Sequence, residues 1–271
     1  MKRVIEVQDL SYRYPDGTEA LKGVSFSIDW GTKTVLLGPN GSGKSTLIMH
    51  LNGVFLPQKG KVFVDGQEVT KKTEQTVRRK VGIVFQDPDD QVFASTVWED
   101  VAFGLFNLGM QEKEIKERVE EVLKLVGVWH LRNRIPYHLS YGEKKKVALA
   151  GVLVMEPEIV VLDEPGTYLD PQGKRELFWM LDELCKNRKT LLIATHDVDL
   201  AAEWADKVII LKEGRVLKEG GKDLLLEEEV LAEANLVFPR ISELFLRAGF
   251  PKEKVPFTVE EAIRVLKGAI R

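Results

Sequence analysis

Apolar and polar residues alternate along the first part of the chain. Residues 3–9 and 24–30 follow this period of two, which is typical of strands with one buried side and one solvent-facing side. Residues 61–69 contain Asp65 and Gly66 between two short strand-like runs, and this pair favours a tight hairpin turn. The pattern therefore predicts an antiparallel β subdomain near the start of the chain.

Farther along, short runs of consecutive apolar residues replace the alternation. A strand that is buried on both faces, as in a parallel sheet, has no solvent-facing side and therefore need not alternate. These runs predict the central strands of an α/β core. They occupy residues 34–37, 80–85, 159–162, 190–195 and 207–211, and a last strand at 215–218 follows Glu213 and Gly214.

Two parts of the chain have helical patterns. Residues 112–126 form an amphipathic stretch, so we expect a helical subdomain inserted into the core at about residues 87–156. From residue 222 to 271 the sequence is again helical and charged, which predicts a C-terminal helical extension after a first domain at 1–221. The apolar stripe of the amphipathic stretch consists of Ile115, Val119, Val122, Leu123 and Val126, and Thr258 and Glu261 have capping-box spacing in the extension.

The loop between the first core strand and the next helix matches the phosphate-loop pattern G-x-x-x-x-G-K-[ST]. Its glycines let backbone N–H groups converge on an anion, and the helix start adds partial positive charge. The lysine of this pattern reaches the β- and γ-phosphates, and its hydroxyl residue coordinates Mg²⁺. We therefore predict a RecA-like P-loop NTPase core. The matching residues are Gly38, Pro39, Asn40, Gly41, Ser42, Gly43, Lys44, Ser45 and Thr46, with Lys44 on phosphate and Ser45 on Mg²⁺.

Polar residues end two other predicted core strands. Asp163 and Glu164 follow the run at 159–162, and His196 follows the run at 190–195. Ligands of α/β sheets bind at the carboxyl ends of the strands, so these side chains are candidates for the same site. We predict that Asp163 holds Mg²⁺, directly or through water, and that Glu164 orients and deprotonates the attacking water. His196 is placed to meet the γ-phosphate.

Ser140 and Tyr14 each have two interpretations. Ser140 and Glu143 have the spacing of a capping box, so Ser140 begins a helix whose free N–H groups can bind an anion, although most caps are only structural. Tyr14 lies in a turn and can stack on a purine, but a packing role fits its position equally well.

Composition and charge narrow the functional classes. The chain has 39 basic and 42 acidic residues and a net charge of −3, so it has no long-range attraction to nucleic acid. The basic run at 71–80 lacks aromatic residues and is expected to be a solvated face. The single cysteine, Cys185, excludes an internal disulfide and is expected to be buried and inert. Because Lys2 and Arg3 precede a charged strand and no apolar run approaches the roughly 20 residues that span a bilayer, we expect a soluble intracellular protein.

Taken together, these motifs resemble the nucleotide-binding subunits of ABC transporters over residues 3–220. Their order along the chain is also that of the family, which makes the resemblance far more specific than the phosphate loop alone. The matching segments are the Walker A motif at 38–46, the Q-loop Gln86, the signature LSYGE at 139–143, the Walker B motif IVVLDEP at 159–165, the D-loop LDP at 169–171 and the switch His196.

The resemblance implies a head-to-tail dimer with a second ABC ATPase subunit, either another copy or a related chain. Two ATP molecules would lie between the protomers, each contacted by one phosphate loop and by the partner's signature. It assigns Tyr14 to adenine stacking and Gln86 to sensing Mg²⁺ and contacting a membrane subunit. The predicted catalytic residues are Glu164, His196 and Gln86; the predicted nucleotide contacts beyond the phosphate loop are Tyr14, Ser140, Gly142 and Asp170; and the predicted Mg²⁺ ligands are Ser45, Gln86 and Asp163.

A narrower resemblance links residues 85–104, residues 200–216 and the C-terminal extension to the ATPases of energy-coupling-factor importers. The substrates of those importers are vitamins or cobalt and nickel ions. The resemblance implies a transmembrane coupling subunit, a separate substrate-binding membrane subunit, and a peripheral location at the cytoplasmic face of the cell membrane. The aromatic residues within 87–110 fit docking of the coupling subunit and packing of the helical subdomain equally well.

Two tyrosines depart from the family pattern. Tyr141 stands in the signature where a second glycine is usual, and Tyr168 stands before the D-loop where small residues are usual. As the first helical residue after Ser140, Tyr141 is expected to lean outward and leave the N–H groups free.

The resulting prediction is an ATPase that couples ATP hydrolysis to import through separate membrane subunits. The alternative is a soluble ABC ATPase that acts on nucleic acid or ribosomes. Such proteins usually carry two cassettes or a long coiled-coil insertion, and this sequence has neither. A GTPase or small-molecule kinase is disfavoured because the sequence contains no N-K-x-D guanine motif and does contain a signature helix.

Overall fold

The computed structural model of the chain describes residues 2–269. Its first part is an antiparallel sheet, as the alternating pattern predicts. Asp65 and Gly66 form the predicted hairpin turn with φ values of +48° and +76°, the left-handed backbone that a two-residue hairpin of this type requires. The strand order is β2-β1-β4-β5, with bounds β1 Arg3–Arg13, β2 Glu19–Asp29, β4 Lys59–Val64 and β5 Gln67–Glu68.

A second sheet carries the predicted core strands. All of its neighbouring pairs are parallel except the edge pair formed by the last two strands of the chain. The predicted apolar runs are thus confirmed as strands of one sheet. Its order is β10-β9-β3-β8-β7-β6, with bounds β3 Lys33–Leu37, β6 Val81–Val84, β7 Ile159–Asp163, β8 Thr190–Thr195, β9 Lys207–Lys212 and β10 Arg215–Gly220.

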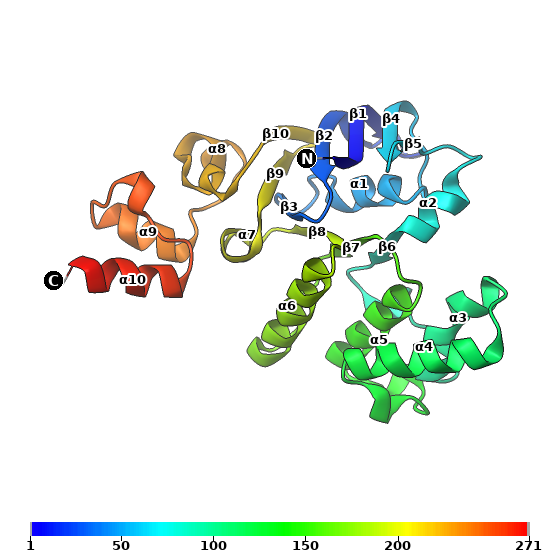
Figure 1. Cartoon of the computed structure of the whole chain (residues 1–271). Coiled ribbons are helices and arrows are strands. Elements are labelled where there is room, and N and C mark those ends of the chain that lie inside the picture. The colour runs from blue at the N-terminus through cyan, green and yellow to red at the C-terminus, as the bar shows by residue number, and fades with distance from the viewer. Residues whose placement is uncertain (1, 270–271) are drawn as a thin grey trace.

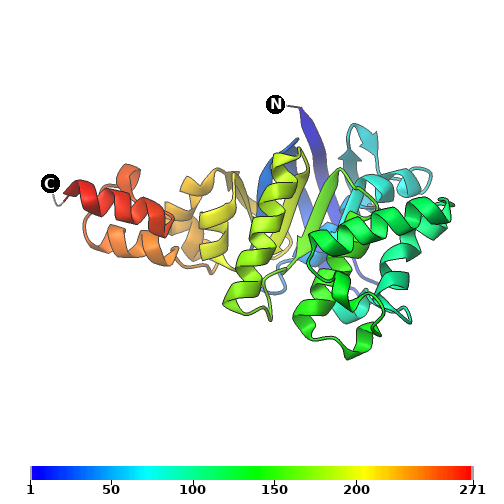
Figure 2. The same cartoon turned by 60° about the horizontal axis from the view of Figure 1, so that its bottom comes forward.

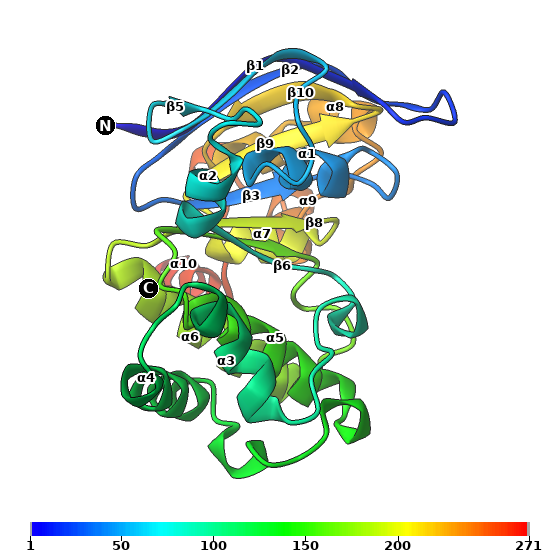
Figure 3. The ribbon, with the colours of Figure 1, turned by 90° about the vertical axis from the view of Figure 1, so that its right-hand side faces the viewer.

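The parallel sheet is buried on both faces, which explains its unbroken apolar runs. In β7, Ile159 and Val161 enter the core shared with the antiparallel sheet, whereas Val160 and Leu162 enter the core shared with the helices. Helix α1 (Lys44–Leu51) fills the first core, and Figure 3 shows it between the antiparallel strands and the strands of the second sheet. The sheet thereby separates two hydrophobic cores.

The predicted helical insertion lies between β6 and β7. The stripe predicted for residues 112–126 is buried, which confirms the amphipathic helix. In Figure 1 the helices of the insertion form a group to one side of the parallel strands. Their bounds are α3 Val97–Asn107, α4 Glu112–Leu125 and α5 Tyr141–Leu153, joined by short 3₁₀ turns at Pro88–Asp90, Trp129–Leu131 and Pro136–His138.

Helices α6 (Pro171–Lys186) and α7 (Val198–Trp204) pack on the same face of the sheet. After β10 the chain becomes helical, and Figure 2 shows these last helices projecting to one end of the molecule. None of the helices within residues 2–269 is long and apolar enough to cross a membrane. The final bounds are Lys222–Leu226 for a 3₁₀ turn, α8 Glu228–Glu233, α9 Arg240–Arg247, a second 3₁₀ turn at Lys252–Lys254 and α10 Val259–Ala269.

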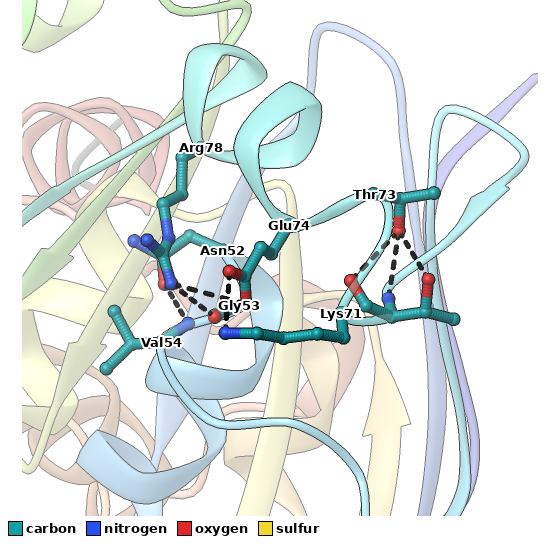
Figure 4. A network of polar contacts seen from close by, with 8 residues as sticks. Asn52, Gly53, Val54, Lys71, Thr73, Glu74 and Arg78 are labelled. Carbon is teal, nitrogen blue, oxygen red and sulfur yellow. Dashed lines mark hydrogen bonds and ion pairs between the residues drawn. The ribbon is translucent and has the colours of Figure 1, made fainter.

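The basic run at 71–80 is a largely solvated face, as expected, since only Val77 in it is buried. It contains α2 (Glu74–Lys80), and Arg78 of this helix donates to the carbonyl of Gly53 at 2.9 Å (Figure 4). This bond ties α2 to the loop after α1. Cys185 is half-buried rather than buried, and its Sγ lies 3.5 Å from the carbonyl oxygen of Gly31.

Candidate active site

The phosphate loop connects β3 to α1 and depends on close backbone approach. A Cβ atom on Gly38 would lie 2.2 Å from the carbonyl oxygen of Leu211, so only glycine fits there. Gly43 has a φ of +102°, and a Cβ there would lie 2.7 Å from the carbonyl oxygen of Ala20. The loop is therefore clamped between β9 and β2.

The chemistry of this loop fits a bound phosphate. No side chain caps α1, so the N–H groups of its first turn have no partner from the cap position. Among the described residues, the buried hydroxyl of Ser42 has no hydrogen-bond partner. Lys44 is only 6% exposed, and its Nζ donates to the carbonyls of Gly38 at 2.7 Å and Pro39 at 3.1 Å. Burial lowers the pKa of Lys44, while Glu164 and Asp163 oppose that effect.

A pocket of about 640 Å³ brings most of the predicted nucleotide contacts together. The loop and α1 form one wall, the ends of the core strands form another, and the turn after β1 closes it. The predicted site residues that line it are Tyr14, Asn40, Gly41, Gly43, Lys44, Ser45, Thr46, Gln86, Asp163 and Glu164.

Tyr14 lines this pocket and also packs. Its hydroxyl lies 2.9 Å from the Thr46 hydroxyl, and its ring contacts the rings of Tyr12 and Phe55 edge to face. The packing interpretation is therefore correct in the structure, and adenine stacking stays a prediction.

Glu164 lies at the end of β7 with both carboxylate oxygens engaged. Oε2 accepts from the Thr195 hydroxyl at 3.0 Å, and Oε1 accepts from the backbone N–H of His196 at 3.0 Å. The Nδ1 of His196 is 2.7 Å from the same Oε1. Because an ionised carboxylate only accepts, Nδ1 carries the hydrogen and Nε2 is left for another contact. Glu164 and His196 thus contact each other, but His196 lines a neighbouring pocket and not the pocket of the phosphate loop. Contact of His196 with the γ-phosphate stays a prediction.

Asp163, next to Glu164, is 6% exposed. Burial is the main cause that raises the pKa of Asp163, against the opposing effect of the Ser45 side chain. A carboxylate beside a hydroxyl is a donor set that suits Mg²⁺, which takes few protein ligands and completes its shell with water and substrate phosphate. Residues 2–269 contain no group of three or more histidine, cysteine, aspartate or glutamate side chains that could hold a metal ion.

The predicted nucleotide contacts outside Tyr14 and the phosphate loop lie in a different pocket, of about 550 Å³. Ser140, Gly142 and Asp170 all line it. Ser140 caps α5, and the capping box with Glu143 is complete in both directions, as predicted. Asp170 caps α6 by accepting from the N–H of Gly173 at 2.6 Å. One chain therefore carries two separate sets of candidate nucleotide contacts.

Tyr141 and Tyr168, the two residues that depart from the family pattern, contact each other. The rings of Tyr141 and Tyr168 meet edge to face with centroids 4.9 Å apart, and the Tyr141 hydroxyl donates to the carbonyl of Gln86 at 3.2 Å. The ring of Tyr141 thus reaches back over the segments that carry Tyr168 and Gln86, and these contacts were not predicted. That Tyr141 leaves the first N–H groups of α5 free for an anion stays a prediction.

Sequence reasoning missed Lys145 and Asp100. Lys145 is buried on α5 beneath the Glu164 turn, and Asp100 is buried at the start of α3. Lys145 interrupts an otherwise apolar face of its helix at 148, 149 and 152, and that interruption is a signal in the sequence.

Comparison with known proteins agrees with this geometry. Residues 21–167 match the family model of the ABC transporter domain. The chain is 49% identical to the energy-coupling factor transporter ATP-binding protein EcfA of Carboxydothermus hydrogenoformans, over 98% of both chains. It is 47% identical to the protein of the same name in Methanocaldococcus jannaschii, over 96% of both chains.

Two solved structures share the fold. One is cbiO1 from Clostridium perfringens, described as part of the ABC transporter complex cbiONQ, with 43% identity, a TM-score of 0.76, and coverage of 91% of this chain and 100% of that one. The other is the dimeric ATP-binding cassette MJ0796 in a post-hydrolysis state with ADP and Pi, with 29% identity, a TM-score of 0.75, and coverage of 80% and 98%. The predicted α/β P-loop fold is confirmed.

Proposed function

Since this chain belongs to the ABC transporter family, as an ATPase of the energy-coupling-factor type, we propose that it works in a head-to-tail dimer. In our proposal, ATP binding and hydrolysis in that dimer import a vitamin or a cobalt or nickel ion through separate membrane subunits. The chain would be attached peripherally, at the cytoplasmic face of the membrane.

One observation supports the proposed dimer: the predicted nucleotide contacts of this chain are divided between two pockets. The first pocket holds the phosphate loop and Glu164, and the second holds the start of α5 with Ser140 and Gly142. Two copies related by a two-fold axis would place the second pocket of one copy against the first pocket of the other. Each ATP would then meet both sets of contacts. The dimeric cassette bound to ADP and Pi supports this arrangement by analogy.

Within such a site, this chain's own residues would divide the work. The first-turn N–H groups of α1 and the Lys44 ammonium would bind phosphate oxygens, and the N–H groups at Ser140 would bind the γ-phosphate from the partner side. Ser45, Asp163 and Gln86 would hold Mg²⁺, which neutralises charge that develops on the phosphates. Glu164 would accept the proton of the attacking water, since a carboxylate has lone pairs beyond those already engaged. His196 would orient Glu164 through Nδ1.

The exposed aromatic residues of the helical insertion support docking of a membrane subunit. Phe93 and Phe103 are 66% and 48% exposed and contact each other edge to face at 4.9 Å, and Phe106 lies one turn further along α3. Clusters of exposed aromatic side chains are typical of protein interfaces. In our proposal this surface receives the coupling subunit.

A charge at Phe93 tests this proposal. We expect Phe93→Asp to abolish co-purification of the chain with co-expressed membrane subunits, while ATP binding by the isolated chain stays unchanged. Trp179→Asp, at a 64% exposed aromatic on α6, is the matched control and should co-purify normally. Normal co-purification of Phe93→Asp would contradict the docking surface. Binding of vitamins, Co²⁺ and Ni²⁺ to the intact complex would then decide the substrate.

A further inference from the structure

Lys145 binds the backbone of the turn that carries Glu164. Its Nζ donates to the carbonyl oxygens of Glu164 at 3.0 Å, Pro165 at 3.1 Å and Thr167 at 2.8 Å. An ammonium group has three N–H donors, so each donor has its own acceptor. The side chain comes from α5, one turn after the Ser140 cap, and is 7% exposed.

The ammonium group of Lys145 is buried and still carries its charge. Burial lowers the pKa of Lys145 to about 8, and the carboxylates of Glu164 and Asp163 oppose this effect. The amine is therefore protonated at neutral pH. The ring of Tyr141, one helical turn earlier, lies over the ammonium at 5.5 Å, and Tyr168 packs against that ring.

The turn itself has a backbone that needs external support. Glu164 and Tyr168 have φ values of +45° and +62°, in the left-handed region that residues other than glycine rarely adopt. Between them, three carbonyl groups turn to the same side and converge on Lys145. The Glu164 carbonyl also accepts from the Thr167 N–H at 3.2 Å, within the turn. Without the ammonium, the three carbonyls would lose the one partner that they share, and the turn would be held less firmly.

We infer that Lys145 is a positioning residue for Glu164: by holding the 164–167 turn, it aims the Glu164 carboxylate at the pocket of the phosphate loop. This inference rests on the proposed role of Glu164 as the base. Lys145 is not among the described residues that line the 640 Å³ or the 550 Å³ pocket, so its direct contacts are with the turn, while its charge also acts on the nearby carboxylates of Glu164 and Asp163. It also joins the helix that starts at Ser140 to the residue that performs the chemistry in the other pocket.

Steady-state ATPase kinetics of Lys145→Met tests the inference. We expect kcat to fall by about ten- to a hundredfold, because small displacements of a catalytic group have effects of this size, while KM for ATP changes by less than about threefold. Lys145→Gln retains two N–H donors and should fall between wild type and Lys145→Met. A loss of less than twofold in both variants, or a KM that rises in step with the loss, would overturn the inference.

Lys189→Met is the matched control. Lys189 also binds two backbone carbonyls, those of Glu156 and Pro157, but at the opposite end of β7. We expect this variant to be destabilised in urea unfolding to a similar degree as Lys145→Met and to keep wild-type kcat. If Lys189→Met loses as much kcat as Lys145→Met, the effect is one of stability and the positioning role is wrong.

A double-mutant cycle with Glu164→Gln separates this inference from the role of Glu164. If Lys145 acts through Glu164, adding Lys145→Met to Glu164→Gln should lower the residual turnover by less than about twofold. An additive loss would overturn the positioning role alone. Normal turnover in Glu164→Gln would instead contradict the proposed base, whatever Lys145→Met does.

Discussion

Asp100 connects the stability of the helical insertion to the surface that we propose for docking. Its Oδ2 accepts from the backbone N–H groups of Phe93 at 2.7 Å and Ala94 at 2.8 Å, and the residue is 8% exposed. These two bonds form the turn that presents the Phe93 ring. We predict that Asp100→Ala destabilises the protein by about 2–4 kcal/mol and that Asp100→Asn changes stability by less than about 1 kcal/mol.

The two variants are expected to differ in stability because the hydrogen bonds of Asp100 stabilise the fold, whereas its buried charge destabilises it. Removing the acceptor leaves two partly buried N–H groups without a partner, at about 1–3 kcal/mol each. The charge contributes in the opposite direction: burial raises the pKa of Asp100 more than the two N–H groups lower it, so the ionised form is disfavoured in the folded state. Asparagine keeps an acceptor and has no charge to desolvate.

The raised pKa of Asp100 also predicts how the stability of the protein depends on pH. Because the folded-state pKa is raised above the ordinary 3.8, Asp100 takes up its proton more readily in the folded protein. As the pH falls from 7 toward 4, wild type should therefore gain stability relative to Asp100→Asn, and the comparison cancels the other carboxylates. Urea unfolding at several pH values measures this difference. Equal losses in Asp100→Ala and Asp100→Asn at pH 7, or no relative gain on acidification, would refute the reasoning.

Three further substitutions probe the two pockets. Gly38→Ala places a methyl group 2.2 Å from the Leu211 carbonyl and should weaken ATP binding at least about tenfold by calorimetry, whereas Gly220→Ala, with no atom within 4 Å, should leave it unchanged. Gly142→Asp should leave thermal unfolding unaffected, because a Cβ there would lie 3.4 Å from the nearest atom of Leu169 and a carboxylate is favourable at a helix start. Hydrolysis should fall at least about a hundredfold, because the carboxylate repels phosphate. Turnover near wild type would exclude Gly142 from the ATP contacts. Tyr14→Ala should weaken ATP binding about tenfold if the ring stacks on adenine, and Tyr14→Phe should not; equal affinities would leave Tyr14 with packing alone.

The sequence was sufficient for features set by neighbouring residues. The turn at Asp65 and Gly66, the capping box at Ser140 and Glu143, and the buried stripe of α4 depend on spacings of one to four residues, and all three are confirmed. The phosphate loop is equally local, since strand, glycines and helix follow one another directly. The division of the predicted nucleotide contacts between two pockets agrees with the dimer that the family resemblance implies.

Contacts across long stretches of chain could not be predicted in this way. Lys145 reaches carbonyls about twenty positions further along the sequence, and Tyr141 reaches Gln86 fifty-five positions earlier. Backbone carbonyls leave no trace in residue type, so nothing marked the 164–167 turn as a ligand for an ammonium group. The contact of Tyr141 with Tyr168 was not predicted for the same reason, because the two residues are distant in sequence.

In our proposal, Glu164 is the base of an ATPase that works as a head-to-tail dimer. The most direct test of this proposal is size-exclusion chromatography of Glu164→Gln with and without Mg-ATP, combined with an ATPase assay. Glutamine keeps the shape of the side chain but cannot accept the proton, so turnover should fall at least about a hundredfold while ATP remains bound. We expect a dimer with ATP and a smaller species without it. Near-normal turnover together with one elution position in both conditions would contradict the proposal.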